Sequence, residues 1–158
     1  MPYDDEDAQD NIVRRARQLG RMDNDDDRVS CAPRIGCDLA EIEAVRESVA
    51  VFGERYLGRV YSMIERSQTS EAPERLAARF AGKEAVLKLL GVDGLQPRQV
   101  EIVADASGVP GVRLSAAAQA SARAQGIGDI AISLSHEGGL ALATAVALAT
   151  RPLPGRTG

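Results

Sequence analysis

Apolar residues recur at spacings of three and four in two stretches of the chain, and this pattern predicts two amphipathic helices. The first helix covers residues 40–52 and ends at Gly53. The second begins near Pro73, because proline suits the first turn of a helix. It runs to about residue 90 and places on one arc Leu76, Phe80, Val86, Leu87 and Leu90. Between the two helices, residues 54–64 are basic and partly aromatic, and residues 65–73 are polar.

Shorter apolar runs predict strands on either side of these helices. Residues 32–38 form one strand, which ends in the carboxylate of Asp38. Residues 100–103 and 111–114 flank a turn at 105–108 and form a hairpin. Ser115 caps an alanine-rich helix that reaches residue 125, and residues 130–135 and 140–148 form two further strands. This order of elements predicts a mixed α+β fold.

The length of 158 residues favours one domain, and 44% hydrophobic with 27% charged residues is typical of a globular protein. Residues 1–30 carry nine acidic and five basic side chains, whereas residues 31–158 carry fourteen of each, so the first segment alone accounts for the net charge of −4. We therefore predict an acidic, disordered extension over residues 1–30, a folded domain over 31–150 and a frayed tail over 151–158.

Composition also excludes several classes of protein. No apolar run approaches the roughly 20 residues that cross a bilayer, and the first 30 residues are too acidic for a secretory signal, so we expect a cytoplasmic protein with no membrane partner. Balanced charge over residues 31–158 and only 3% aromatic residues argue against nucleic acid as a partner. Cys31 and Cys37 have no His or Cys at zinc-ligand spacing and are predicted to be free thiols.

Charged residues inside the second helix point to chemistry. Arg79 and Lys83 project into the apolar arc, and such cations must either snorkel or meet a buried anionic partner. Glu84 and Lys88 lie one turn apart along the edge of that arc, which places a carboxylate for a metal beside an ammonium for a phosphate. This pattern predicts a magnesium and phosphate site. The same spacing also suits an ordinary surface ion pair, and Asp38 also suits the N-cap of the helix that follows it.

Three motifs occur in order: Gly36-Cys37-Asp38 followed by Glu41, then Arg-Phe-Ala-x-Lys-Glu-Ala-x-x-Lys from Arg79 to Lys88, then Ser133-Leu134-Ser135-His136. Together they resemble the signatures of the holo-acyl-carrier-protein synthases, a family of small phosphopantetheinyl transferases. The resemblance spans roughly residues 34–149, and the middle motif is highly specific. It implies a phosphopantetheinyl transferase-like fold, in which a small and mostly antiparallel sheet packs with helices.

The resemblance implies that 4'-phosphopantetheine passes from coenzyme A to a serine of an apo acyl carrier protein, with release of adenosine 3',5'-bisphosphate. Mg²⁺ is the expected cofactor, with Asp38 and Glu84 as its ligands and Lys88 on a phosphate oxygen as charge builds on the leaving group. The serine proton would pass to Glu84, to Asp38 or to a metal-bound water, and the sequence does not separate these bases. The expected contacts of coenzyme A are Arg79, Lys83, Lys88, Gly91, Ser135 and His136.

Relatives dock an acidic carrier protein on a basic surface, for which the candidates here are Arg46, Arg55 and Arg59. The family usually has a basic residue six positions after the first-motif aspartate, where this chain has Ala44, and this difference leaves the mode of docking open. A homotrimer with sites between subunits is also implied. The carrier could serve fatty acid, polyketide or peptide synthesis. Two alternatives remain: a non-catalytic coenzyme A binder of the same fold, and a structural α+β domain.

Overall fold

The computed structural model describes residues 30–151, which lie in a unit bounded by Ser30 and Pro152, with the side chains of the two end residues Ser30 and Arg151 left out. The predicted disordered extension and frayed tail fall almost wholly on residues 1–29 and 152–158, outside the described residues. Within the described part the fold is α+β, as predicted, with five α-helices, one 3-10 helix and two antiparallel sheets.

The larger sheet consists of β1 (Ser30–Glu41), β5 (Leu140–Arg151) and β4 (Ile127–Glu137), in the order β1-β5-β4. All its pairings are antiparallel, and a register shift between Ile127 and Ile130 interrupts β4. The three strands predicted at residues 32–38, 130–135 and 140–148 are confirmed, and each is longer than its apolar run. Strands extend beyond the run because backbone pairing continues through the polar residues that flank it.

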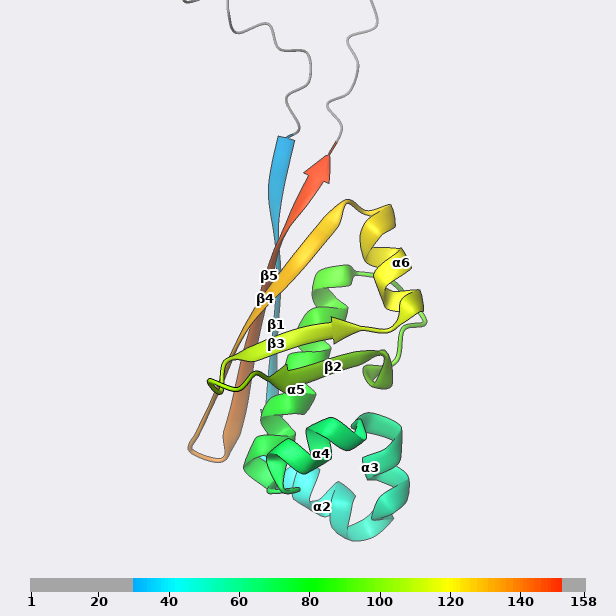
Figure 1. Cartoon of the computed structure of the whole chain (residues 1–158). Coiled ribbons are helices and arrows are strands. Elements are labelled where there is room, and N and C mark those ends of the chain that lie inside the picture. Colours follow the sequence, from blue (N-terminus) through cyan, green and yellow to red (C-terminus); the bar gives the residue numbers. More distant parts are fainter. Residues whose placement is uncertain (1–29, 152–158) are drawn as a thin grey trace, which may run out of the picture. The chain divides into compact units, whose positions relative to one another are not determined.

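Helix α5 (Pro73–Leu90) lies between this sheet and the smaller one (Figure 1). Close packing is possible because β5 presents a row of buried alanines to the helix, namely Ala141, Ala143, Ala145, Ala147 and Ala149. On β1, a Cβ atom added at Gly36 would overlap the carbonyl oxygen of Ala85 in α5. Gly36 of the first motif thus allows strand and helix backbones to touch.

The smaller sheet is the predicted hairpin of β2 (Val100–Ala104) and β3 (Pro110–Leu114). It follows a 3-10 helix, η1 (Pro97–Gln99), and leads into α6 (Ala116–Ala124), whose first turn is capped by the hydroxyl of Ser115. Side chains, rather than another strand, cover the free edge of β2. Glu65 accepts from the backbone N–H of Ile102, and the Gln68 amide both donates to and accepts from the backbone of Ala104.

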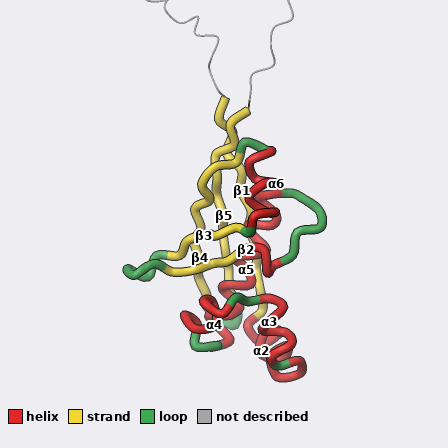
Figure 2. The backbone as a smooth tube through the Cα atoms, turned by 45° about the vertical axis from the view of Figure 1, so that its right-hand side comes forward, coloured by secondary structure: helices red, strands yellow, loops and turns green. Residues whose placement is uncertain are grey.

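Three helices gather at one end of the unit, while α6 lies toward the other (Figure 2). They are α2 (Ile42–Phe52), α3 (Glu54–Val60) and α4 (Met63–Thr69). The first was predicted, although it starts two residues later. The other two were not, because helices of seven residues show too little periodicity to be recognised. A capping box stabilises α4: Ser62 accepts from the Glu65 N–H, and Glu65 accepts from the Ser62 N–H.

The two faces of the larger sheet differ in environment. One face packs against α5, and the opposite face, which we call the outer face, carries large apolar side chains that no described residue buries. They lie on β1 and β5 and comprise Ile35, Leu39, Leu140, Leu142, Val146 and Leu148. An exposed apolar surface of this kind on a sheet is typical of a contact with another polypeptide.

Candidate functional site

Asp38 and Lys88 form an ion pair between β1 and α5. The register of β1 against β5 pairs Asp38 with Ala143, which places the carboxylate on the sheet face that packs against α5. The Lys88 Nζ donates to Asp38 Oδ1 over 2.7 Å and to the backbone oxygen of Cys37 over 3.2 Å. This hydrogen bond and the negative charge of Asp38 raise the pKa of Lys88 above its ordinary value. The Lys88 side chain remains 57% exposed, so its ammonium is accessible from solvent.

Glu84 completes the same charged group. Partial burial raises the pKa of its carboxyl above the ordinary value, the negative charge of Asp38 raises it further, and the positive charge of Lys88 opposes both effects. The structure therefore brings together two carboxylates that lie far apart in the sequence, with one lysine beside them. Since Glu84 and Lys88 are one turn apart on α5 and Asp38 ends the first motif, the two motifs meet at this place.

This donor set fits a hard divalent cation. No cluster of three or more His, Cys, Asp or Glu side chains suited to a metal occurs among residues 30–151. Magnesium, however, is commonly held by one or two carboxylates, and water and substrate phosphate oxygens complete its octahedron. The mutual repulsion of Asp38 and Glu84, now offset by Lys88, is the electrostatic situation that a cation would relieve.

Lys83 lies elsewhere, although it neighbours Glu84 in the sequence. Its side chain is fully buried, and its Nζ donates to Glu65 Oε2 over 2.8 Å, to the Pro97 oxygen over 3.3 Å and to the Val100 oxygen. Burial lowers the pKa of Lys83, and the charge of Glu65 opposes that shift. The expected contact of Lys83 with coenzyme A is therefore not supported by its position, because all three ammonium protons point at acceptors inside the chain. The buried anionic partner expected for it is Glu65, which the sequence analysis did not single out.

Arg79, one turn before Lys83, is only partly buried. Its Nε is enclosed and has no hydrogen-bond partner among the described residues. Burial lowers the pKa of Arg79, and the charge of Glu65 acts in the opposite direction. A guanidinium with an unused donor is suited to a phosphate, so the predicted contact with coenzyme A remains a prediction.

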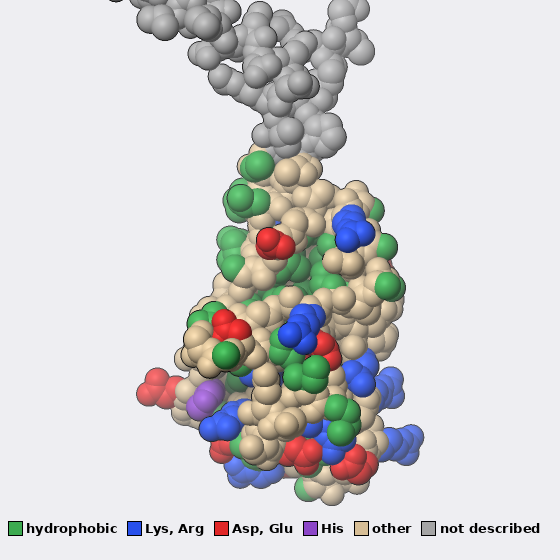
Figure 3. Space-filling view, in the orientation of Figure 1, with side chains coloured by type: hydrophobic (Ala, Val, Ile, Leu, Met, Phe, Trp, Pro, Cys, Tyr) green, Lys and Arg blue, Asp and Glu red, His purple; other side chains and the backbone are tan. Residues whose placement is uncertain are grey.

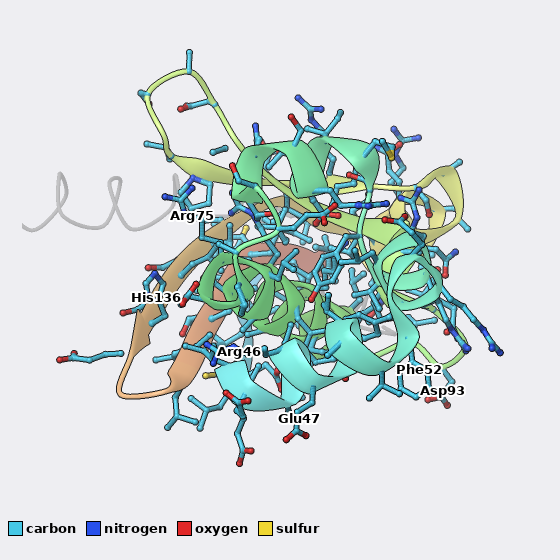
Figure 4. All side chains as sticks on the ribbon, turned by 90° about the horizontal axis from the view of Figure 1, so that it is seen from below. Arg46, Glu47, Phe52, Arg75, Asp93 and His136 are labelled. Atoms are coloured by element: carbon cyan, nitrogen blue, oxygen red, sulfur yellow. The ribbon has the colours of Figure 1, made fainter. Side chains whose placement is uncertain are left out.

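The third motif divides between the two faces of the sheet. His136 pairs with Ala141 and shares the face of Asp38, whereas Ser135 pairs with Leu142 and shares the outer face. In Figure 4 His136 lies on the same side of the unit as Arg75, an exposed residue of α5 that the sequence analysis did not consider.

Gly91 ends α5 in the left-handed conformation, with a φ of 58°, and its N–H donates to Leu87 O over 3.0 Å. This conformation alone accounts for a glycine at the end of the helix. The expected contact of Gly91 with coenzyme A stays a prediction.

The three candidate docking residues lie on α2 and α3. Arg46 is exposed and pairs with Glu43 over 3.1 Å, and Arg55 and Arg59 are exposed on α3. Figure 3 shows Lys and Arg side chains interspersed with Asp and Glu side chains over the end of the unit formed by α2, α3 and α4. Val51 and Phe52 are exposed at the end of α2, which adds apolar surface to this charged region.

Comparison with known proteins identifies the class. The family model described as the 4'-phosphopantetheinyl transferase superfamily matches residues 34–145. A holo-[acyl-carrier-protein] synthase of Chloroflexus aggregans is 42% identical in an alignment of 130 residues that covers 71% of this chain and 92% of the relative. The corresponding protein of Herpetosiphon aurantiacus is 37% identical over 123 residues, covering 72% of this chain and 96% of the relative.

Solved structures agree with this assignment. The holo-[acyl-carrier-protein] synthase of Neisseria meningitidis superposes with a TM-score of 0.66 at 31% identity, covering 72% of this chain and 96% of that one. The Helicobacter pylori enzyme, solved in complex with coenzyme A, gives a TM-score of 0.65 at 27% identity, with 72% and 98% covered. The chain therefore belongs to the 4'-phosphopantetheinyl transferase superfamily, and within it to the holo-[acyl-carrier-protein] synthases, as its three motifs predicted.

Proposed function

We propose that this protein transfers 4'-phosphopantetheine from coenzyme A to a serine hydroxyl of an apo acyl carrier protein, in a magnesium-dependent reaction that releases adenosine 3',5'-bisphosphate. The observation that carries the proposal is the convergence of Asp38, Glu84 and Lys88 at the contact of β1 with α5. The relatives named above support the same substrates, since they are holo-[acyl-carrier-protein] synthases and one was solved with coenzyme A.

In the proposed reaction the serine oxygen forms a bond to the phosphorus that carries pantetheine. The bond from this phosphorus to the bridging oxygen of the diphosphate breaks, and adenosine 3',5'-bisphosphate leaves with the electron pair. Such a transfer depends mainly on positioning and on stabilisation of charge. Magnesium bound by Asp38 and Glu84 would supply neutralisation of the diphosphate charge.

The residues of the chain have separate tasks in this scheme. Lys88 donates to a phosphate oxygen as charge builds on the leaving group, and its exposed ammonium needs only to turn from Asp38 to do so. Asp38 holds Lys88 in place until the substrate binds. Arg79 and His136 contact coenzyme A phosphates. The serine proton passes to Glu84, to Asp38 or to a water between them.

The carrier protein docks on α2 and α3 in this proposal. Arg46, Arg55 and Arg59 meet acidic side chains of the carrier, and Val51 and Phe52 contact its apolar surface. Ala44 is exposed on α2 and offers no charge, so the arginines of α3 carry more of the electrostatic attraction.

A homotrimer is the assembly we propose, and the outer face of the larger sheet supports it. Its six large apolar side chains are exposed in the single chain and would become buried between copies. Ser135 shares this face, so in the assembly it would lie near a neighbouring subunit.

No helix within residues 30–151 is long and apolar enough to span a membrane. We place the reaction in the cytoplasm.

The direct test is to incubate the protein with coenzyme A, Mg²⁺ and apo acyl carrier proteins, and to follow the mass of each carrier. We expect the pantetheine adduct on at least one carrier, and its loss when a chelator removes Mg²⁺. Binding of coenzyme A without an adduct on any carrier would instead favour a non-catalytic coenzyme A binder.

A further inference from the structure

Glu65 and Lys83 form an ion pair that is fully enclosed by the chain. Both side chains have no exposed surface, and the Lys83 Nζ lies 2.8 Å from Glu65 Oε2. Taking two charges out of water is costly, and a pair of apolar side chains of similar volume often gives equal or greater stability. The pair is therefore poorly explained by stability alone.

The hydrogen bonds of the pair join several segments to one turn of α5. Lys83 also donates to the backbone oxygens of Pro97 in η1 and Val100 in β2. Glu65, in α4, accepts from the N–H groups of Ser62 and Ile102 as well. Every ammonium proton has an acceptor, and both carboxylate oxygens accept, so rotation or sliding of α5 at this turn would break several bonds at once.

The opposite side of the same turn is held by close backbone contact. Ala85 follows Glu84, and its carbonyl oxygen lies where a Cβ atom of residue 36 would be, so α5 rests directly on β1. Glu84 thus sits between two attachments: Lys83 on the side of β2 and Ala85 on the side of β1. The position of its carboxylate relative to Asp38 depends on both attachments.

We propose that Glu65 and Lys83 are positioning residues, which fix the turn of α5 that carries Glu84 and thereby set the distance between the Glu84 and Asp38 carboxylates. The proposal rests on the proposed function for its effect on transfer. It gives Lys83 of the middle motif a role different from a contact with coenzyme A, and it gives a role to Glu65, which lies outside all three motifs.

The test compares Lys83→Met and Glu65→Gln with the wild type. Methionine keeps much of the aliphatic volume and removes the ammonium, whereas glutamine keeps the shape and an oxygen that can accept from Ile102 N–H. Ile127→Ala is the control, because Ile127 is buried at the start of β4, at the opposite end of the strand from His136 and outside the docking helices. All proteins are assayed at a temperature where circular dichroism shows them folded.

Two readouts separate positioning from general stability. The first is the affinity for coenzyme A, measured by calorimetry with and without Mg²⁺. Mg²⁺ should increase the affinity of the wild type for coenzyme A, and we expect this increase to be at least threefold smaller in both variants. Without Mg²⁺, their affinity for coenzyme A should stay within about twofold of the wild-type value. The second is the rate of transfer, where we expect kcat to fall at least tenfold with little change in the KM for coenzyme A. The Ile127→Ala control should keep both the Mg²⁺-dependent affinity and kcat near the wild-type values.

The proposal is overturned if the variants keep the wild-type kcat and the wild-type increase in coenzyme A affinity on addition of Mg²⁺. It is also overturned if both quantities fall no further than they do in a control variant of equal melting temperature. If Lys83→Met does not fold, Glu65→Gln decides the matter by the same criteria. Failure of the proposed function looks different, because the wild type itself would then show no transfer. If Mg²⁺ increases the affinity of the wild type for coenzyme A but no transfer occurs, calorimetry on the variants still tests the positioning of Glu84. If the wild type shows neither effect, both proposals are overturned.

Discussion

Replacing Glu84 by Gln should leave the protein as stable as before, or slightly more stable, while it removes most of the activity. The pKa of Glu84 is raised by burial and by Asp38, so at neutral pH the ionised carboxylate destabilises the folded state. Glutamine has the same shape and no charge. The Glu84 side chain is only partly buried, and Lys88 opposes the repulsion, so the gain after solvent screening is less than about 1 kcal/mol. This corresponds to an increase of at most about 4 °C in melting temperature.

The effect on transfer should be far larger. Removal of one hydrogen-bond donor to a developing oxyanion typically costs about 2.7–4 kcal/mol in the transition state, or roughly 10²–10³ in kcat, and we expect loss of the proposed metal ligand to cost at least as much. The assay is the rate of mass gain of an apo carrier, with thermal unfolding followed on the same samples. A matched control is Glu101→Gln, which removes another partly buried glutamate, on β2.

The pH dependence of stability independently checks the direction of this stability change. A raised folded-state pKa means that the folded protein binds the Glu84 proton more tightly than the unfolded chain does. The destabilisation of the folded state by the ionised Glu84 therefore grows as pH rises from the unfolded pKa through the folded one. The stability advantage of Glu84→Gln should therefore be present at pH 7 and shrink as pH falls through the raised pKa of Glu84. Wild-type turnover in the variant, or a clear loss of stability at pH 7, would refute the reasoning.

Further variants test the backbone contact, the docking surface and the outer face. Gly36→Ala should lower the free energy of unfolding in urea by about 1–3 kcal/mol because a Cβ overlaps the α5 backbone, whereas Gly128→Ala, with open space around it, should change it little; equal urea midpoints would contradict this. Arg59→Glu should raise the KM for the carrier at least several-fold and leave that for coenzyme A unchanged; an equal effect from Arg123→Glu on α6 would argue against a specific surface. Leu142→Glu should convert the proposed trimer to monomer in light scattering, and an unchanged mass would exclude the outer face as the subunit contact.

The sequence was sufficient to predict the elements whose pattern is local. The β2–β3 hairpin, the Ser115 cap and the Pro73 start of α5 all appear as predicted. The two seven-residue helices were missed because their stability comes from caps and from contacts outside the helix. Ser62 and Glu65 do form a capping box signature in the sequence, and this was the signal that could have located α4.

The candidate site, like the fold, could be predicted from the sequence only in part. The resemblance to the holo-acyl-carrier-protein synthases implied that Asp38, Glu84 and Lys88 act together, and the structure places them at one contact. Periodicity also showed that Lys83 points into the apolar arc, but it could not identify what lies opposite. Glu65 is 18 residues away, and only the packing of α4 against β2 and α5 brings it to the lysine. Partners of this kind depend on tertiary structure, which no local pattern contains.

The side chains of α4 that cover β2 also bear on how the protein behaves at high concentration. Strand edges with unpaired N–H and C=O groups can recruit another chain, and here Gln68 occupies both backbone groups of Ala104. A Gln68→Ala variant would expose that edge in every molecule of a crowded solution. Its defect should therefore appear as turbidity that increases with protein concentration, in enzyme that still turns over normally when dilute.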